Sequence, residues 1–287
     1  MEANRAYLPL QHGDLQLILD PAHGGAIREF NRRGRPIFRP TPEHAGADPF
    51  DLACFPMVPY ANRIAGGQFT FGTRSVQLDR NWRHDPHPLH GQGWRLPWTV
   101  VRSTASGATL MFEGGDDEWP WRYRSEQYCQ LRANALVMTL AVENLAQSPM
   151  PVMLGLHPYF SDAARAVLQA SVPRVWETDD ASLPIKETTT SSAWSFDTPR
   201  PIATVPLDHC FVDWDGSATI LWPDRRVTLQ ATNCRHLHVY APSGRDFFCL
   251  EPLSAPVGEL NRGAKNDSIV QPGQHYAIKV RFEVGDA

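Results

Sequence analysis

Apolar and polar residues alternate with a period of two along most of this 287-residue chain. The alternation is clearest from Leu136 to Val142 and from Tyr276 to Val284, where a large apolar residue occupies every second position. This spacing places alternate side chains on opposite faces of a β-strand, so both segments are predicted to be strands with one buried face. No window of ten or more residues repeats with the period of a helix.

Turn residues separate these strands. Gly72-Thr73 interrupts the alternating run from Gln68 to Leu78, and residues 223–226 separate two apolar runs, so each pair of runs is predicted to form a hairpin. The 25 prolines and 20 glycines are dispersed rather than gathered in a linker. Many short strands with this punctuation predict an all-β fold, a large sandwich or barrel, forming a single domain over residues 1–287. Residues 177–201, rich in Thr and Ser, are predicted to be long surface loops that rim a site.

Composition and charge exclude several classes of partner. The formal net charge of −4 and the pI near 6.2 offer no electrostatic basis for binding nucleic acid or an anionic membrane. The five widely spaced cysteines lie mostly in apolar runs, which predicts reduced, buried thiols rather than disulfides. The first residues lack the apolar region of a secretory signal, and no apolar stretch reaches the roughly 20 residues that span a bilayer. We therefore expect a cytoplasmic protein; its oligomeric state is left open.

Two distant motifs carry the candidate chemistry. Residues 155–160 read Gly-Leu-His-Pro-Tyr-Phe, and residues 248–252 read Phe-Cys-Leu-Glu-Pro. In each, an ionisable residue precedes a proline and is predicted to be the last residue of a strand, because proline disfavours continuation. His157 and Glu251 held together at such strand ends could act as an acid and a base near neutral pH. Taken singly, each residue is better explained as a strand cap that bonds nearby backbone, and only the other motifs favour the catalytic interpretation.

Three further motifs accompany them: Tyr-Ala-Asn-Arg-Ile-Ala-Gly-Gly at 60–67, Pro-Leu-His-Gly at 88–91 and Leu-Asp-His-Cys-Phe at 207–211. Together, and in this order from about Pro56 to Pro252, the five motifs resemble those of the aldose 1-epimerase (galactose mutarotase) family. The compact segment 89–98 is similar to the shorter bacterial epimerase-like proteins of that family. The resemblance implies a large twisted antiparallel β-sandwich, the galactose mutarotase-like supersandwich.

The resemblance also implies a reaction and the groups that perform it. A mutarotase removes a proton from the C1 hydroxyl of an aldose and delivers one to the ring oxygen, and it then recloses the ring on the other carbonyl face. By resemblance Glu251 is the base and His157 the acid, and partial burial can raise the pKa of a Glu toward the working pH. The substrate is expected to be a free sugar, and no cofactor is expected.

Five other residues are expected to bind the sugar. By resemblance, Arg63 reaches the reacting hydroxyls, His90 bonds the ring or its hydroxyls, and Asp208 holds distal hydroxyls. Asn62 and Tyr159 are further candidates. Each has a simpler alternative: a surface ion pair for the arginine, loop or turn hydrogen bonds for His90, Asn62 and Asp208, and packing for the tyrosine. Among the nine tryptophans, the pair next to His90, at positions 94 and 98, is the one that could stack on a sugar.

Three other functions remain open. A hexose-6-phosphate epimerase would need Arg95, Arg122 or Arg124 to converge on the pocket. A non-catalytic carbohydrate-binding protein on the same fold would not need both members of an acid–base pair.

A metal-dependent enzyme is the third. The alternation of Cys234, His236 and His238 on a strand would place all three on one face, and His84, His87 and His90 form a second cluster. Neither set has a fourth ligand at a recognisable spacing, so no metal is expected.

Overall fold

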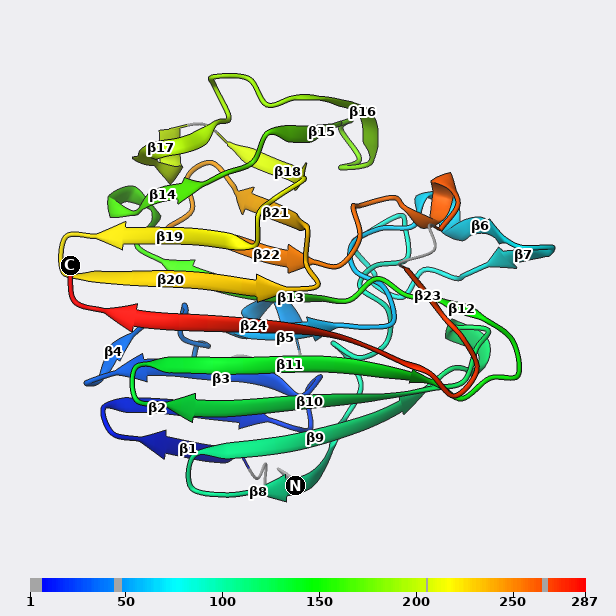
Figure 1. Ribbon diagram of the computed structural model, residues 1–287, viewed down its shortest axis with the longest axis horizontal. Coiled ribbons are helices and arrows are strands. Elements are labelled where there is room, and N and C mark those ends of the chain that lie inside the picture. Colours follow the sequence, from blue (N-terminus) through cyan, green and yellow to red (C-terminus); the bar gives the residue numbers. More distant parts are fainter. Residues whose placement is uncertain (1–6, 44–47, 205, 265–267) are drawn as a thin grey trace.

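The computed structural model describes residues 7–43, 48–204, 206–264 and 268–287. In these residues two large sheets stack face to face (Figure 1). Neighbouring strands within each sheet pair in the antiparallel direction. The first is an 11-stranded sheet with strand order β1-β2-β3-β5-β13-β22-β21-β18-β15-β16, in which β4 also pairs with β3. Its strands are β1 (Leu8–His12), β2 (Leu15–Asp20), β3 (Ala26–Arg32), β4 (Arg35–Pro36), β5 (Cys54–Met57), β13 (Gly155–Ser161), β15 (Arg174–Thr178), β16 (Pro184–Thr189), β18 (Leu207–Val212), β21 (His236–Ala241) and β22 (Phe247–Leu253).

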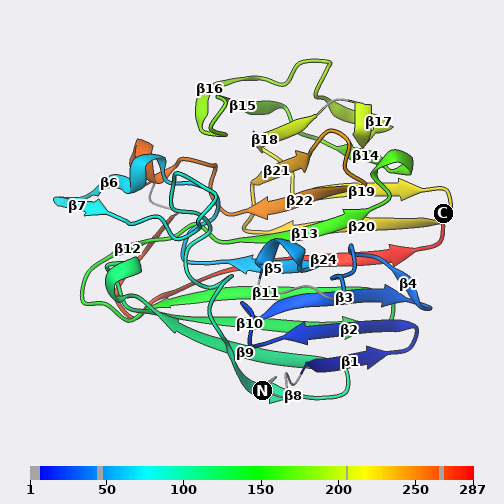
Figure 2. The same cartoon turned by 180° about the vertical axis from the view of Figure 1, so that it is seen from behind.

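The second sheet has nine strands in the order β17-β14-β19-β20-β24-β11-β10-β9-β8. They are β8 (Thr99–Ser103), β9 (Gly107–Gly114), β10 (Tyr123–Arg132), β11 (Ala135–Asn144), β14 (Val167–Ala170), β17 (Phe196–Pro201), β19 (Ser217–Trp222), β20 (Arg225–Thr232) and β24 (His275–Gly285). Two small ladders join β6 (Gln68–Phe71) to β7 (Arg74–Gln77) and β12 (Met150–Pro151) to β23 (Ile269–Val270). The twisted all-β sandwich predicted from the sequence is therefore confirmed (Figures 1 and 2).

Helical structure in the described chain is limited to three-residue 3-10 turns: η1 (Pro49–Asp51), η2 (Ala65–Gly67), η3 (Asp116–Glu118), η4 (Ala163–Arg165), η5 (Ile202–Thr204) and η6 (Leu260–Arg262). Accordingly, no helix of the described residues is long and apolar enough to cross a membrane.

The main core lies between the two sheets. The alternate apolar residues that the sequence predicted to face one side of a strand are buried there. Every second residue of β11 from Leu136 to Val142 is buried, and so are the four alternate residues from Ile278 to Val284 in β24. The Gly72-Thr73 hairpin is confirmed by the pairing of β6 with β7. The second predicted hairpin also forms, with a shorter turn, because the arginines that follow Asp224 already belong to β20. All five cysteines are buried and free, as predicted.

One expectation about the fold is wrong. The stretch 177–201 was predicted to be long loops, but it contains the end of β15 and all of β16 and β17. Strands β16 and β17 lie at the edges of the two sheets and are only partly buried. An edge strand buries neither face completely, so its sequence need not alternate and the pattern gives no signal.

The strands at the middle of the larger sheet are buried on both faces. Almost every residue of β5, β13 and β22 is buried, because one face packs on the second sheet and the other lies beneath loops. Those loops place Phe50 and Trp94 against Phe55, with ring centroids 6.0 and 5.4 Å apart. The covered outer face of this sheet is where the polar residues of the candidate site lie.

Candidate active site

Neighbouring strands align a row of side chains across the outer face of the larger sheet. His157 pairs with Phe55 on one side, and Glu251 pairs with His238 on the other. Between β13 and β22, Gly155 pairs with Leu253 and Tyr159 pairs with Cys249. His157 lies midway between the two β13 residues, so it is opposite Glu251. Directly opposed residues on antiparallel strands share a face and lie close together. The strand register therefore brings the two motifs together.

The prediction that these two residues end their strands is wrong. Strands β13 and β22 continue through Pro158 and Pro252 to Ser161 and Leu253. A proline only lacks the N–H donor, so it leaves a gap in the ladder while the extended backbone continues. That gap falls where His157 faces Glu251. The pair consequently lies in the interior of the sheet, where neighbouring strands fix both side chains.

The His157–Glu251 pair is almost completely enclosed. Nε2 of His157 lies 3.3 Å from Oε1 of Glu251, and the two side chains are 6% and 2% exposed. Burial, and after it the charge of His238, lowers the pKa of His157 to about 3. Burial raises the pKa of Glu251 to about 7, although the charge of His238 opposes this. Oε2 of Glu251 accepts no hydrogen bond from any described residue, so it is free to take a proton from a ligand.

Asp208 is held by two donors on its two oxygens. Nε2 of His238 lies 2.8 Å from Oδ1, and the hydroxyl of Ser182 donates to Oδ2 at 2.6 Å. Burial raises the pKa of Asp208, but the hydrogen bond from His238, that residue's charge and the bond from Ser182 outweigh it, so the net pKa falls well below its ordinary value. For His238, burial lowers the pKa, yet the charge of Glu251 and the bond to Asp208 raise it well above its ordinary value. At neutral pH, a carboxylate and an imidazolium face each other here.

His90 and Asn62 hold each other across two loops. The backbone N–H of Asn62 donates to Nδ1 of His90 at 3.0 Å, and the backbone N–H of His90 donates to the carbonyl of Asn62. An Nδ1 that accepts a hydrogen bond places the ring proton of neutral His90 on Nε2. Burial, followed by the charge of His157, keeps the pKa of His90 well below its ordinary value. His90 is thus a neutral hydrogen-bond donor beside the acid–base pair.

Arg63 both forms an ion pair and lines the cavity, which were the two alternatives considered for it. Its Nε donates to Oδ2 of Asp85 at 2.8 Å, and its side chain also lines the pocket. Asp85 additionally accepts from the backbone N–H of His87, which fixes the carboxylate. The ion pair therefore orients the guanidinium of Arg63 toward the cavity instead of removing it from the site.

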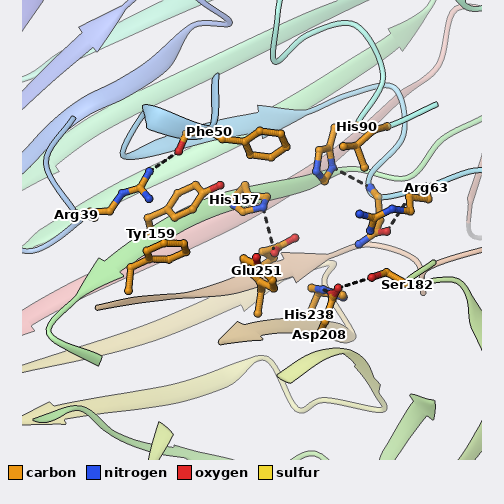
Figure 3. A pocket seen from close by; sticks show the side chains of 14 residues that line it. Arg39, Phe50, Arg63, His90, His157, Tyr159, Ser182, Asp208, His238 and Glu251 are labelled. Atoms are coloured by element: carbon orange, nitrogen blue, oxygen red, sulfur yellow. Dashed lines mark hydrogen bonds and ion pairs between the residues drawn. The ribbon is translucent and has the colours of Figure 1, made fainter. Parts of the chain in front are cut away.

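The opposite end of the cavity is aromatic and cationic. The ring of Tyr159 stacks on His157 with centroids 4.8 Å apart and an interplanar angle of 24°. The guanidinium of Arg39 lies over the Tyr159 ring, 3.9 Å from its centre, and 4.8 Å from the ring centre of Phe247. Figure 3 shows Tyr159 between Arg39 and His157.

Together these groups line one cavity of about 400 Å³ (Figure 3). This volume is typical of small-molecule sites. All seven residues proposed from the sequence lie in its lining: Asn62, Arg63, His90, His157, Tyr159, Asp208 and Glu251. The sequence motifs did not mark the other seven as catalytic or sugar-binding residues: Arg39, Phe50, Leu89, Ser182, His238, Tyr240 and Phe247. His238 carried a usable signal, since a histidine within an apolar strand needs a polar partner, but no motif marked the others.

Three sets of residues considered from the sequence do not lie where their suggested roles require. Cys234 precedes β21, and among the described residues Cys234, His236 and His238 form no group with metal-ligating spacing; His238 bonds Asp208 instead. None of the arginines considered for a 6-phosphate lines the cavity, and two are paired elsewhere, Arg95 with Glu118 and Arg124 with Glu113. Trp94 and Trp98 are buried, bond backbone carbonyls through their indole N–H groups and do not line the cavity, so neither is placed to stack on a sugar.

One group of potential metal ligands does occur within the site. His157, Cys249 and Glu251 offer donor atoms within 4.8 Å of one another. The adjacent His238 imidazolium and the Arg39 guanidinium oppose a divalent cation at this position. The thiol is also protonated, because burial raises the pKa of Cys249 well above its ordinary value. The arrangement suits proton transfer better than metal binding.

Comparison with known proteins places the chain among sugar epimerases. The profile of the family described as aldose 1-epimerase matches residues 9–283. An uncharacterized Escherichia coli K12 protein, YphB, is 31% identical over 287 residues, covering 96% of this chain and 97% of its own. A crystal structure of a protein from Escherichia coli K12 superposes with a TM-score of 0.91 at 27% identity, covering 98% of this chain and 99% of the other. The galactose 1-epimerase of Lactobacillus acidophilus shares the fold, with a TM-score of 0.80 at 15% identity and coverage of 98% and 94%.

Proposed function

The chain belongs to the aldose 1-epimerase family, and we propose that it is a mutarotase that interconverts the α and β anomers of a free aldose. The observation that carries the proposal is the buried His157–Glu251 pair at the floor of a sugar-sized cavity. A hemiacetal opens only if one group takes a proton while another gives one. The two side chains stand 3.3 Å apart, so both reach adjacent oxygens of one sugar.

In the proposed reaction, Glu251 takes the proton of the C1 hydroxyl and His157 donates a proton to the ring oxygen. The C1–O5 bond breaks, its electron pair stays on O5, and a C1 aldehyde forms. Rotation about the C1–C2 bond presents the other carbonyl face, and the two proton transfers then run in reverse. No electrons leave the sugar and no group is transferred, so the reaction needs no cofactor.

The pair must share one proton for this reaction to occur. Its reactive form is a Glu251 carboxylate beside a His157 imidazolium, which arises when the proton of the neutral pair moves from Glu251 to His157. With a Glu251 pKa of about 7 and a His157 pKa of about 3, the pair holds one proton between these values. Exchange of one proton over a short distance suits roles that reverse on ring closure.

The surrounding groups are proposed to orient the sugar. Asp208, ionised and fixed by His238, accepts from sugar hydroxyls, while the Nε2–H of His90 donates to the ring or a hydroxyl. Arg63 offers a fixed positive charge that stabilises oxygen as it becomes negative. Asn62 fixes His90, and Tyr159 packs against the face of the His157 ring.

Polarimetry on freshly dissolved α-D-glucose and α-D-galactose tests this function. We expect wild-type protein to accelerate the approach to the equilibrium rotation, and Glu251→Gln to lower kcat by about 10²- to 10⁴-fold, because the amide keeps the shape but cannot accept a proton. Glu126→Gln, on an exposed position of β10, is the matched control and should behave as wild type.

Asp208→Asn should raise KM more than it lowers kcat, because its carboxylate is proposed to bind hydroxyls and not to react. Wild-type turnover by Glu251→Gln would remove Glu251 from the mechanism. If wild-type protein accelerated no aldose at all, the mutarotase proposal would fail, and a binding role would gain support.

A further inference from the structure

Arg39 lines the cavity without a carboxylate partner. Its Nη2 donates to the carbonyl oxygens of Phe50 and Leu52, and neither bond neutralises its charge. No aspartate or glutamate among the described residues lies within ion-pair distance of it. Arg63, the other arginine of the cavity, is paired with Asp85 at 2.8 Å. Arg39 therefore contributes the uncompensated guanidinium of this pocket.

The guanidinium is held in a fixed orientation. One flat face lies over Tyr159, and Phe247 is the second aromatic neighbour. Cation–π contact and the two backbone acceptors fix the stem and one edge, and Nη1 makes no hydrogen bond within the described chain. Nε is buried and also lacks a protein partner. Nη1 is therefore the part of this rigid guanidinium that is left to donate a charge-assisted hydrogen bond to an anion.

The position of Arg39 relative to the acid–base pair indicates which part of a sugar it faces. If Glu251 contacts the C1 oxygen and His157 the ring oxygen, as in the proposed function, C5 and its substituent lie beyond His157, away from Glu251. Tyr159 stacks on His157 on that side, and Arg39 covers Tyr159 (Figure 3). The atom attached to C5 is only two bonds from the ring oxygen. The substituent of C5 therefore extends toward Arg39.

We propose that Arg39 determines substrate class: the cavity takes an aldose whose C5 substituent carries an anionic group, bound by Nη1 of the Arg39 guanidinium. A hexuronate places its carboxylate directly on C5, and a hexose 6-phosphate places its phosphate two bonds further out. Both supply the same chemistry, a compact anion that accepts hydrogen bonds. This inference rests on the proposed function, because it uses the orientation that the acid–base pair gives the sugar.

Anomer exchange can be measured by NMR saturation transfer on equilibrated D-glucose, D-glucuronate and D-glucose 6-phosphate. For each sugar, kcat/KM is obtained with wild type, Arg39→Met and Arg39→Lys. The readout is selectivity, the kcat/KM for the anionic sugar divided by that for glucose, so a general loss of packing around Tyr159 cancels. We expect wild type to prefer an anionic sugar and Arg39→Met to lower the selectivity by about 10- to 100-fold, the range for a lost charge-assisted hydrogen bond.

Arg39→Lys should restore part of the selectivity, because it returns the positive charge but does not place a donor at the position of Nη1. Arg124→Met, on the outer surface of β10 and paired with Glu113, is the matched control and should leave the selectivity at the wild-type value. A preference for glucuronate over glucose 6-phosphate would identify the carboxylate as the anion, and the reverse order would identify the phosphate.

Two results separate this inference from the proposed function. If wild type exchanges the anomers of glucose but does not prefer either anionic sugar, or if Arg39→Met leaves the selectivity unchanged, the role of Arg39 is wrong and the mutarotase proposal stands. If wild type exchanges the anomers of none of the three sugars, the proposed function itself fails.

Discussion

At the scale of single residues, the behaviour of the site depends on one proton shared by two buried side chains. Above a pH of about 7, Glu251 is ionised and His157 neutral, so a base is present without an acid. At pH values below about 3, both groups are protonated and the base is lost. The pair is competent only between these limits.

We therefore expect the kcat/KM for mutarotation to fall on the alkaline side with a midpoint near pH 7. In His238→Gln the midpoint should move to higher pH. The imidazolium of His238 favours the ionised form of Glu251, so its loss makes Glu251 hold its proton more tightly. Polarimetric rates across the pH range measure both midpoints.

His275→Gln, at the exposed start of β24, provides the control for that shift and should keep the wild-type midpoint. A midpoint in His238→Gln that stayed in place or moved to lower pH would show that the alkaline limb does not report the His157–Glu251 pair.

The site residues differ in how far the sequence could identify them. His157 and Glu251 lie in motifs whose order marks a family, so they could be proposed without a structure. His238 was considered only as a metal ligand, because its partner Asp208 is 30 positions away in the chain and meets it through the pairing of β18 with β21. Arg39 carries no motif, and its importance depends on the absence of an acidic neighbour among the residues that the structure describes. Such a property belongs to the folded surroundings.

At the scale of elements, the site depends on the loop that places His90. His90 and Gly91 both have positive φ, 56° and 69°, and this turn lies against Val58 and Pro59. A Cβ at position 91 would lie 2.4 Å from the carbonyl oxygen of Val58 and 2.6 Å from the proline ring. Both neighbours are rigid, so only glycine allows this approach.

Gly91→Ala should therefore destabilise the protein and weaken sugar binding through displacement of His90. Gly72→Ala is the matched control, because Gly72 has a similar φ of 59° in the β6–β7 turn but no atom within 4 Å of the added carbon. Each alanine has the cost of the left-handed conformation, about 1–2 kcal/mol. Gly91→Ala should cost about 1–3 kcal/mol more, from overpacking. Urea denaturation of both variants measures the difference, and equal losses would contradict a steric role for this glycine.

Elements with regular alternation were predicted correctly, and those without it were not. β11 and β24 each present one apolar face to the core, so their period is visible in the sequence. β16 and β17 lie at sheet edges and are held by backbone pairing, which any polar sequence can supply. The ends of β13 and β22 were predicted incorrectly. A proline that ends a strand and a proline inside a sheet look alike in the sequence, because the difference depends on the neighbouring strands.

At the scale of the whole molecule, aromatic contacts connect the two sheets. The ring of Phe38, which follows β4, contacts Phe160 of the larger sheet at 5.3 Å and Phe282 of the smaller sheet at 5.0 Å between centroids. Phe160 also lies 6.3 Å from Trp222 in β19. The main apolar cluster draws on strands of both sheets, so the two sheets share their main core.

A shared core predicts that the chain unfolds as one cooperative unit, in keeping with the single domain expected from the sequence. In urea, tryptophan fluorescence, far-UV circular dichroism and mutarotation activity should change with one common midpoint. Phe38→Ala, at a fully buried position, should lower the free energy of unfolding by about 3–5 kcal/mol and move all three midpoints together, because the lost contacts stabilise both sheets at once. If activity were lost well before the secondary structure, or if Phe38→Ala split the transition in two, the sheets would be separate folding units. The site, which lies on the larger sheet, would then not require the smaller one.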